Sequence, residues 1–323
     1  MKPNTVCSIG IDVGSTTLKV VVLNDRNEII YKVYRRHKAD FNTLFVEELN
    51  TITSRFSDCR FTIAITGSAG MGISERTGIP FVQEVVASIE VVDKEYPDTH
   101  TLIDLGGEDA KMVFFKDGKQ PDIRMNGSCA GGTGAFIDQM ADLMNIPVEE
   151  LGRQALKYEK LYPVASRCGV FAKTDVQNLI SRNVPVPDIS MSILRTVAVQ
   201  SVTTLARGCD IQPKILCIGG PLTFIPALRD SFVELLNLDE ADLIVPANSE
   251  YFPAWGTAFY NREGETIEDI SLLIQKLGIK DHKRKDVLPA LFANEEEYQS
   301  WKENRKITPL KRAELGSKKN IEC

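Results

Sequence analysis

The strongest constraint on the fold is an internal repeat of a strand–turn–strand unit. Residues 6–25 read as two β-branched, apolar runs around a turn of small residues, and residues 102–118 repeat this pattern at an offset of 92 positions. A repeated supersecondary unit indicates two similar lobes that face one ligand. The identical pairs at this offset are Ile11/Ile103, Asp12/Asp104, Gly14/Gly106, Lys19/Lys111, Val21/Val113 and Asp25/Asp117.

Each copy of the repeat carries the residue types that a phosphate site needs. Glycine and serine at the turn let the chain approach a ligand closely, so that backbone N–H groups can surround phosphate oxygens. Asp12 and Asp104 stand at strand ends, where a carboxylate can hold Mg²⁺ through water. One Gly-Ser turn alone is equally consistent with an ordinary hairpin, but two copies favour a nucleotide with Mg²⁺ between them.

Composition and charge restrict the class of protein. The apolar fraction of 43% is ordinary for a globular chain of 323 residues, so a sizeable core can form. A formal charge of −6 does not favour binding to nucleic acid or to an anionic membrane, both of which attract positively charged proteins. The sequence contains no apolar run of roughly 18 residues and no apolar leader with a cleavage site. We therefore expect no nucleic-acid or membrane partner, and the odd number of cysteines at scattered spacing predicts a reducing, cytoplasmic setting without a disulfide framework.

Two of the seven cysteines stand in loops directly before helical patterns. Cys129 lies in a glycine-rich loop, and Cys168 follows Ser-Arg and precedes Gly-Val-Phe-Ala. The start of a helix favours a thiolate and an anionic cluster, although a lone cysteine is more often a small buried hydrophobe. A [4Fe–4S] cluster normally takes four cysteines, and a twofold dimer would supply two from each chain. These loops predict an iron–sulfur cluster whose remaining ligands come either from other cysteines of the chain or from a second chain.

A further candidate ligand contact follows the strand predicted at residues 215–218. Its Gly219-Gly220-Pro221 end lets backbone approach a flat ligand such as an adenine or ribose. Ala254 and Gly256 begin a helix of small residues that could also face the nucleotide, and close helix packing explains them equally well.

The composition shifts towards charged residues from about residue 270. Basic runs cover 276–285 and 302–319, and an acidic run covers 295–297. This pattern is typical of a solvated appendage or linker. We predict a first lobe over residues 1–100, a second lobe over 101–265 with the cysteine loops, and an appendage over 266–323. The abrupt end at Cys323 is consistent with a fragment of a longer chain.

The motifs together resemble a known family. Residues 12–17, 104–109 and 219–221 look like the phosphate and adenosine motifs of the actin-like ATPase superfamily. The loops around Cys129 and Cys168 narrow the resemblance to the activators of 2-hydroxyacyl-CoA dehydratases and the ATPase subunits of benzoyl-CoA reductases, over about residues 6–262. The resemblance implies an α/β fold of the actin-like type, with two duplicated lobes, mixed β-sheets and flanking helices.

The resemblance implies an ATPase that acts as a one-electron reductase. One [4Fe–4S] cluster would bridge a homodimer through Cys129 and Cys168 of both chains, and ATP hydrolysis would change the angle between the helices at the cluster. A reduced ferredoxin or flavodoxin would donate the electron. An iron–sulfur dehydratase or a double-cubane-cluster protein would accept the electron. The second acceptor is included because residues 166–171 resemble the activase modules of long, fused members of the family.

The resemblance also implies site residues. Asp12 and Asp104 would hold Mg²⁺ through water, and Glu108, Asp104 and Asp109 would position the attacking water. Glu108 stands where dehydratase activators commonly have glutamine. The residues implied for ATP or ADP are Asp12, Gly14, Ser15, Thr16, Thr17, Lys19, Gly106, Gly107, Gly132, Thr133, Gly134, Gly219, Gly220, Pro221, Ala254 and Gly256.

Two alternative functions stay open: an actin-like small-molecule kinase, and a nucleotide-binding regulator without a cluster.

Overall fold

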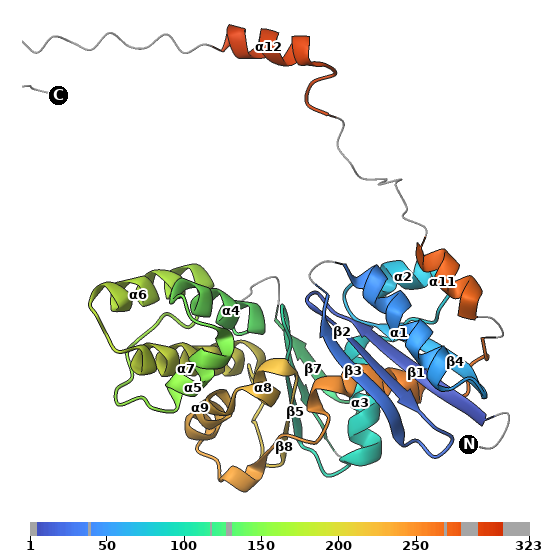
Figure 1. Ribbon diagram of the computed structural model, residues 1–323. Coiled ribbons are helices and arrows are strands. Elements are labelled where there is room, and N and C mark those ends of the chain that lie inside the picture. The colour runs from blue at the N-terminus through green and yellow to red at the C-terminus, as the bar shows by residue number, and fades with distance from the viewer. Residues whose placement is uncertain are drawn as a thin grey trace, which may run out of the picture. The chain divides into compact units, whose positions relative to one another are not determined.

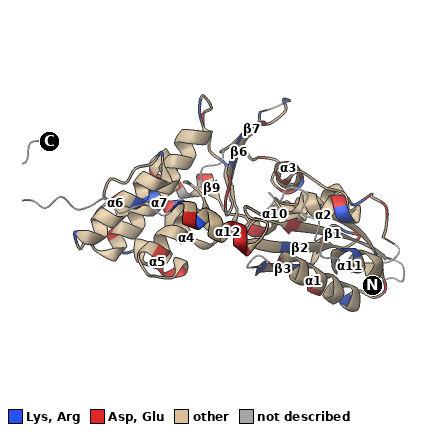
Figure 2. Cartoon of the chain, turned by 90° about the horizontal axis from the view of Figure 1, so that it is seen from above, with Lys and Arg blue, Asp and Glu red and all other residues tan. Residues whose placement is uncertain are grey.

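The computed structural model of the protein describes residues 5–37, 40–116, 118–126, 131–267, 270–278 and 290–305 (Figure 1). The chain divides into two compact units, residues 1–279 and residues 280–323, and both β-sheets lie in the first. Among the described residues, no helix combines the length and the hydropathy needed to cross a bilayer. Figure 2 shows Lys and Arg positions interspersed with Asp and Glu positions along the described elements.

The first lobe is built on a four-stranded sheet with the order β3-β2-β1-β4. Strand β1 pairs antiparallel with β2 and parallel with β4. Alternate β1 residues (Cys7, Ile9, Ile11 and Val13) are buried in the core of this lobe. Its elements are β1 (Thr5–Val13), β2 (Thr17–Leu23), β3 (Ile29–Arg36), α1 (Phe41–Arg55), β4 (Cys59–Thr66), α2 (Gly70–Thr77) and α11 (Ile270–Gly278).

The second lobe repeats this connectivity in a five-stranded sheet with the order β7-β6-β5-β8-β9. Lys19 lies opposite Asp12 in the first hairpin, and Lys111 lies opposite Asp104 in the second. The predicted duplication and actin-like fold are therefore confirmed. The elements are β5 (Thr101–Leu105), β6 (Ala110–Phe114), β7 (Asp122–Met125), α4 (Gly134–Leu143), α5 (Val148–Ala155), α6 (Gly169–Ser181), α7 (Val186–Leu205), β8 (Ile215–Ile218), α8 (Gly220–Phe224), α9 (Pro226–Leu236), η1 (Glu240–Asp242) and β9 (Leu243–Ile244).

Two helices, α3 (Glu84–Glu95) and α10 (Phe252–Tyr260, preceded by the turn η2, Ser249–Tyr251), join the lobes through a third core cluster. This cluster combines side chains of β2 with those of β5, β6 and β8. Glycines allow the close approach: a methyl group on Gly10 would lie 1.9 Å from the carbonyl oxygen of Ala254, and one on Gly256 would lie 1.7 Å from that of Ala87. Helix α10 therefore lies directly against β1 and α3.

Helix α11 falls inside the range predicted as a charged appendage, yet it belongs to the first core. Its Ile270, Leu273 and Leu277 side chains are buried against α1 and α2, because their spacing places them on one face of the helix. The first compact unit therefore extends beyond residue 266. In the second unit, α12 (Glu295–Asn304) is capped by the side chain of Asn294, which accepts a hydrogen bond from the Glu297 N–H.

Candidate functional site

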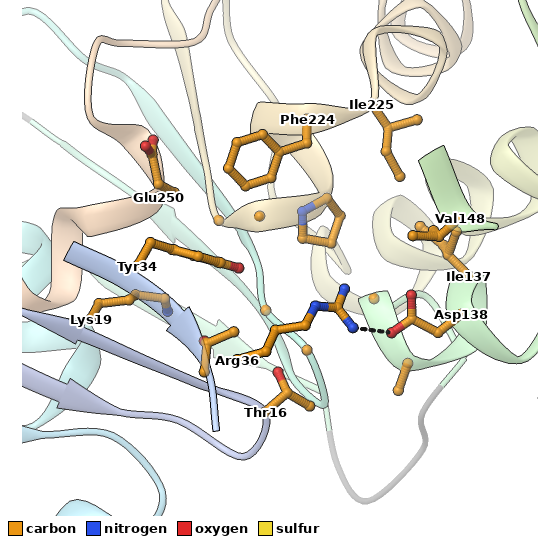
Figure 3. A pocket seen from close by; sticks show the side chains of 18 of the residues that line it. Thr16, Lys19, Tyr34, Arg36, Ile137, Asp138, Val148, Phe224, Ile225 and Glu250 are labelled. Carbon is orange, nitrogen blue, oxygen red and sulfur yellow. Dashed lines mark ion pairs between the residues drawn. The ribbon is translucent and has the colours of Figure 1, made fainter. Parts of the chain in front are cut away.

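A cavity of about 650 Å³ lies between the two lobes (Figure 3). Both hairpins of the repeat and both lobes contribute to its wall, and its size suits a nucleotide-sized ligand. The residues predicted for nucleotide or catalysis that line it are Thr16, Thr17, Lys19, Asp104, Gly106, Gly107, Gly134, Gly219, Gly220 and Pro221.

The two hairpin tips face each other at one end of this cavity. In the first tip the Gly14 N–H donates to the Thr17 carbonyl at 3.0 Å, and in the second the Gly106 N–H donates to the Asp109 carbonyl at 2.9 Å. A methyl group on Gly107 would lie 3.1 Å from the Thr16 hydroxyl oxygen, so the tips nearly touch. Backbone N–H groups of such tips form a concave site for anions.

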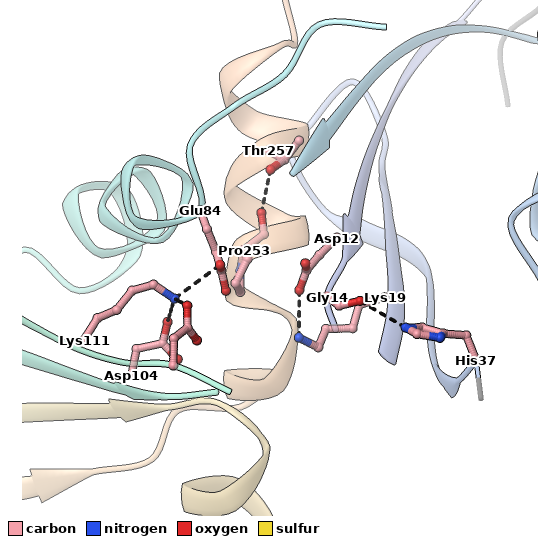
Figure 4. A network of polar contacts seen from close by, with 10 residues as sticks. Asp12, Gly14, Lys19, His37, Glu84, Asp104, Lys111, Pro253 and Thr257 are labelled. Atoms are coloured by element: carbon pink, nitrogen blue, oxygen red, sulfur yellow. Dashed lines mark hydrogen bonds and ion pairs between the residues drawn. The ribbon is translucent and has the colours of Figure 1, made fainter. Parts of the chain in front are cut away.

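Below the first tip, Asp12 and Lys19 form a buried ion pair with an Nζ–Oδ2 distance of 2.7 Å (Figure 4). Burial opposes the charge on Lys19, but the adjacent Asp12 carboxylate raises the pKa of Lys19 well above its ordinary value. The second carboxylate oxygen of Asp12 is buried and accepts no hydrogen bond. Asp12 thus keeps one oxygen available for a further cation or water.

The second hairpin carries the matching cation, Lys111, which lies among three carboxylates. Its Nζ lies 2.8 Å from Asp109, 3.2 Å from Glu84 and 3.8 Å from Asp104. Burial raises the pKa of Asp104, opposed by Lys111, and its Oδ2 accepts no hydrogen bond. With Asp12, Asp104 therefore offers a second buried oxygen without a hydrogen bond.

These two carboxylates fit a hydrated Mg²⁺. Magnesium keeps several waters and is usually bound by one or two carboxylates together with substrate phosphates. Among the described residues, no group of three or more His, Cys, Asp or Glu could hold a metal ion. The donor set formed by Asp12 and Asp104 is thus of the open kind that magnesium uses beside phosphates.

Glu84 lines the cavity, although no sequence motif marks it as a site residue. It occupies the first turn of α3, where an acidic residue is ordinary, and only the position of α3 between the lobes brings it to Asp104 and Lys111. Burial, followed by the repulsion of nearby carboxylates and opposed by Lys111, raises the pKa of Glu84 to about 7. Glu84 can therefore exchange a proton near neutral pH.

The three residues predicted to position water have different environments. Asp104 lines the cavity, whereas Asp109 is bound to Lys111 and Glu108 is exposed at the hairpin tip. Neither Glu108 nor Asp109 belongs to the cavity wall.

The other end of the cavity is apolar, with charged side chains at its rim (Figure 3). Gly219 has a φ of +89°, and a methyl group there would lie 2.1 Å from the Leu105 carbonyl oxygen, so the turn between β8 and α8 requires glycine. No sequence motif marks the other wall residues as site residues. They are Tyr34, Arg36, Ala135, Ile137, Asp138, Val148, Glu149, Arg153, Phe224, Ile225, Glu250 and Pro253.

Several residues predicted for the nucleotide stand outside the wall of this cavity. Ala254 and Gly256 make the close contacts of α10 with β1 and α3, as the packing alternative predicts. Gly132 has a φ of +81°, and Thr133 is buried immediately before α4. The full set outside the wall is Asp12, Gly14, Ser15, Gly132, Thr133, Ala254 and Gly256.

The start of α4 is bonded to the second hairpin tip. The Gly134 N–H donates to the Gly106 carbonyl at 2.9 Å, and the Ala135 N–H donates to the Gly107 carbonyl at 2.7 Å. The helix that follows the predicted cluster loop therefore begins on the predicted phosphate loop.

Cys129 lies outside the described residues, but the end of its loop meets the Cys168 loop. Cys168 is half-buried and occupies the N-cap of α6. A methyl group on the next residue, Gly169, would lie 4.0 Å from the Cα of Gly131. A thiol at the start of a helix fits an anionic iron–sulfur cluster. Val170 and Phe171, which follow, are 73% and 67% exposed.

Comparison with known proteins agrees with this geometry. Residues 9–260 match the BadF/BadG/BcrA/BcrD ATPase family. The (R)-2-hydroxyglutaryl-CoA dehydratase activating ATPase of Acidaminococcus fermentans is 31% identical over 221 residues, which cover 67% of this chain and 83% of that protein.

Solved structures of dehydratase activators are also similar to this chain. The crystal structure of component A of the Acidaminococcus fermentans (R)-2-hydroxyglutaryl-CoA dehydratase matches with a TM-score of 0.70 and 28% identity, covering 79% of this chain and 97% of that one. The activator of the 2-hydroxyisocaproyl-CoA dehydratase from Clostridium difficile, with bound ADPNP, matches with a TM-score of 0.68 and 25% identity, covering 81% and 100%.

Proposed function

Because the chain belongs to the BadF/BadG/BcrA/BcrD ATPase family, we propose that it is an ATP-dependent one-electron reductase that activates a partner iron–sulfur enzyme. The similarity to dehydratase activators supports the activator role. We propose that ATP hydrolysis is coupled to electron transfer, and the main support is the pair of hydrogen bonds between the start of α4 and residues 106–107.

We place the nucleotide across the cavity with its phosphates at the hairpin tips. Backbone N–H groups of both tips and the Lys19 ammonium would neutralise the phosphates, and Asp12 and Asp104 would hold Mg²⁺ through water. The adenosine would then lie towards Gly219 and Gly220 and the apolar wall of Phe224 and Ile225. The ADPNP bound to the related activator supports a nucleotide in this family.

Hydrolysis needs a group that takes a proton from the attacking water. Glu84 is suited to this role because it lines the cavity beside Asp104 and its pKa is raised to about 7. Asp104 would orient the water and the cation, and Lys111 holds both carboxylates in place. We therefore propose Glu84, together with Asp104, as the residues that act on the water, ahead of the predicted Glu108 and Asp109, which lie outside the cavity wall.

Nucleotide state would reach the cysteines through α4. A phosphate-dependent shift of residues 106–107 must move the first turn of α4 or break its two hydrogen bonds. Cys129 stands five residues before Gly134, and its loop ends beside Cys168. A [4Fe–4S] cluster held by Cys129 and Cys168 of two chains would supply the one-electron chemistry. The acceptor would be a dehydratase or a double-cubane-cluster protein, and the donor a reduced ferredoxin or flavodoxin.

The test is the iron and acid-labile sulfide content of protein purified without oxygen. A dimer that shares one cluster should contain about two irons and two sulfides per chain. Cys129→Ser and Cys168→Ser should lose the iron and still bind ATP, while Cys209→Ser, a half-buried cysteine elsewhere, should keep it. Full iron content in both ligand variants would refute the ligand assignment. Unchanged reduction of an acceptor without ATP would refute the ATP coupling.

A further inference from the structure

Strand β3 is an edge strand of the first sheet, and its two faces contact different lobes. On one face, the Tyr31 hydroxyl donates to Glu48 of α1 at 2.6 Å, and the Arg35 guanidinium contacts Glu47 and Glu48 at 2.9 and 3.0 Å. The opposite face carries Lys32, Tyr34 and Arg36, which point away from α1 because side chains alternate along a strand. We call these three residues the β3 clasp.

All three clasp residues contact the second lobe or the connection that leaves it. The Lys32 ammonium donates to the Asn248 side chain and lies 5.1 Å from the centre of the Tyr251 ring. The Tyr34 ring meets the Phe224 ring edge-on, with centroids 5.8 Å apart. These two contacts combine a hydrogen bond with aromatic packing.

Arg36 makes the third contact, at the rim of the cavity (Figure 3). Its Nη1 lies 3.8 Å from Oδ2 of Asp138, and the two side chains are 60% and 41% exposed. Asp138 belongs to α4 and is also faced by the carboxylates of Asp142 and Glu149. An exposed ion pair of this kind contributes little free energy and is weakened by salt. The Arg36–Asp138 contact is thus easily broken.

We propose that Arg36 and Asp138 form a releasable pair across the mouth of the cavity, and that breaking this pair admits and discharges the ligand. Lys32 and Tyr34 keep β3 attached to the second lobe while the pair opens. Because Asp138 lies on α4, the closed pair also holds this helix against the first lobe. The inference rests on the proposed function for the identity of the ligand, an adenine nucleotide, but not for the pair itself.

The proposal predicts a specific kinetic pattern for a fluorescent ATP analogue mixed rapidly with the cluster-bearing protein. Arg36→Ala and Asp138→Ala should each raise the association and dissociation rates two- to fivefold and leave Kd within about twofold, because a gate affects both directions. The double variant should be no faster than either single variant, since the two side chains act as one pair. Raising the salt concentration should accelerate the wild type towards the variants. Glu90→Gln, which breaks the exposed Glu90–Lys94 pair within α3, is the matched control and should change nothing.

Two kinetic outcomes would overturn the proposal. A rise in the dissociation rate alone, with a weaker Kd, would make Arg36 a direct contact of the nucleotide. Rate changes that multiply in the double variant would show that the residues act independently.

Hydrogen–deuterium exchange of the nucleotide-free protein separates this inference from the proposed function. If the pair holds α4, peptides covering 134–143 should exchange faster in both single variants than in the wild type and in Glu90→Gln. Equal exchange in all four proteins would overturn the pair as a restraint on α4. A wild type that binds no ATP analogue would refute the proposed function, and this exchange measurement would still decide whether the pair exists.

Discussion

At the scale of single residues, two glutamates of similar chemistry occupy opposite environments. Glu84 lines the cavity, half-buried beside Asp104 and Lys111, whereas Glu108 is exposed at the second hairpin tip. Since the pKa of Glu84 is raised to about 7, its basic form accumulates above pH 7. ATP turnover should therefore rise between about pH 6 and pH 8, and Glu84→Gln should lower kcat about 100-fold and remove this rise.

The matched variant Glu108→Gln decides between the two glutamates. It should keep kcat and the pH dependence within about twofold, because its side chain lies in solvent. A large loss in Glu108→Gln with normal turnover in Glu84→Gln would restore the sequence-based assignment. The pH profile of each variant, measured with saturating Mg·ATP, gives the answer.

Lys111 supports a prediction about stability. It is 3% exposed and is the cation that compensates Glu84, Asp104 and Asp109. Removing one partner of a buried ion pair leaves charges uncompensated, so Lys111→Gln should lower the free energy of unfolding by about 3 kcal/mol. Lys94→Gln, in an exposed pair, should cost less than about 1 kcal/mol. Equal losses in denaturant titrations would contradict the role of Lys111.

At the scale of elements, the packing of α10 gives a sharp contrast between two glycines. A methyl group on Gly256 would lie 1.7 Å from the Ala87 carbonyl oxygen, and backbone cannot yield as a flexible side chain does. Gly256→Ala should therefore cost at least about 3 kcal/mol or prevent folding. Gly72→Ala, in α2 with no atom within 4 Å of the added methyl, should stabilise by about 0.5 to 1 kcal/mol. Comparable denaturation midpoints for the two variants would contradict this account.

The elements also show what could be predicted from the sequence. The duplicated Asp-x-Gly hairpins predicted both lobes and the facing tips, because the turn residues and the alternating apolar runs are local features. Glu84 and Arg36 could not be assigned in this way. Their roles depend on where α3 and β3 stand between the lobes, and a carboxylate in the first turn of a helix or an arginine at a strand end has no distinctive pattern.

At the scale of the whole molecule, the cavity lies between two lobes that share a core built around α3 and α10. This third cluster is the only one among the described residues that mixes side chains of both sheets. A ligand held by both hairpin tips adds a second connection between the lobes, so nucleotide should stabilise the entire first unit. The hydrogen bonds of α4 then make the cysteine loops part of the same response.

The last prediction concerns the dependence of this stabilisation on the cation. Mg·ADP at about 100 times its Kd adds roughly 2.7 kcal/mol, which should raise Tm by about 5 °C in a unit of this size. Replacing Mg²⁺ by EDTA should remove much of the rise, because the carboxylates of Asp12 and Asp104, each with one oxygen that accepts no hydrogen bond, would then repel the phosphates without a cation between them. Asp104→Asn should respond to ADP equally with and without Mg²⁺, whereas Glu108→Gln should behave as the wild type. A wild-type Tm shift that is the same in EDTA would show that these carboxylates do not hold the cation, and the phosphates would then depend on Lys19 and the backbone of the two tips alone.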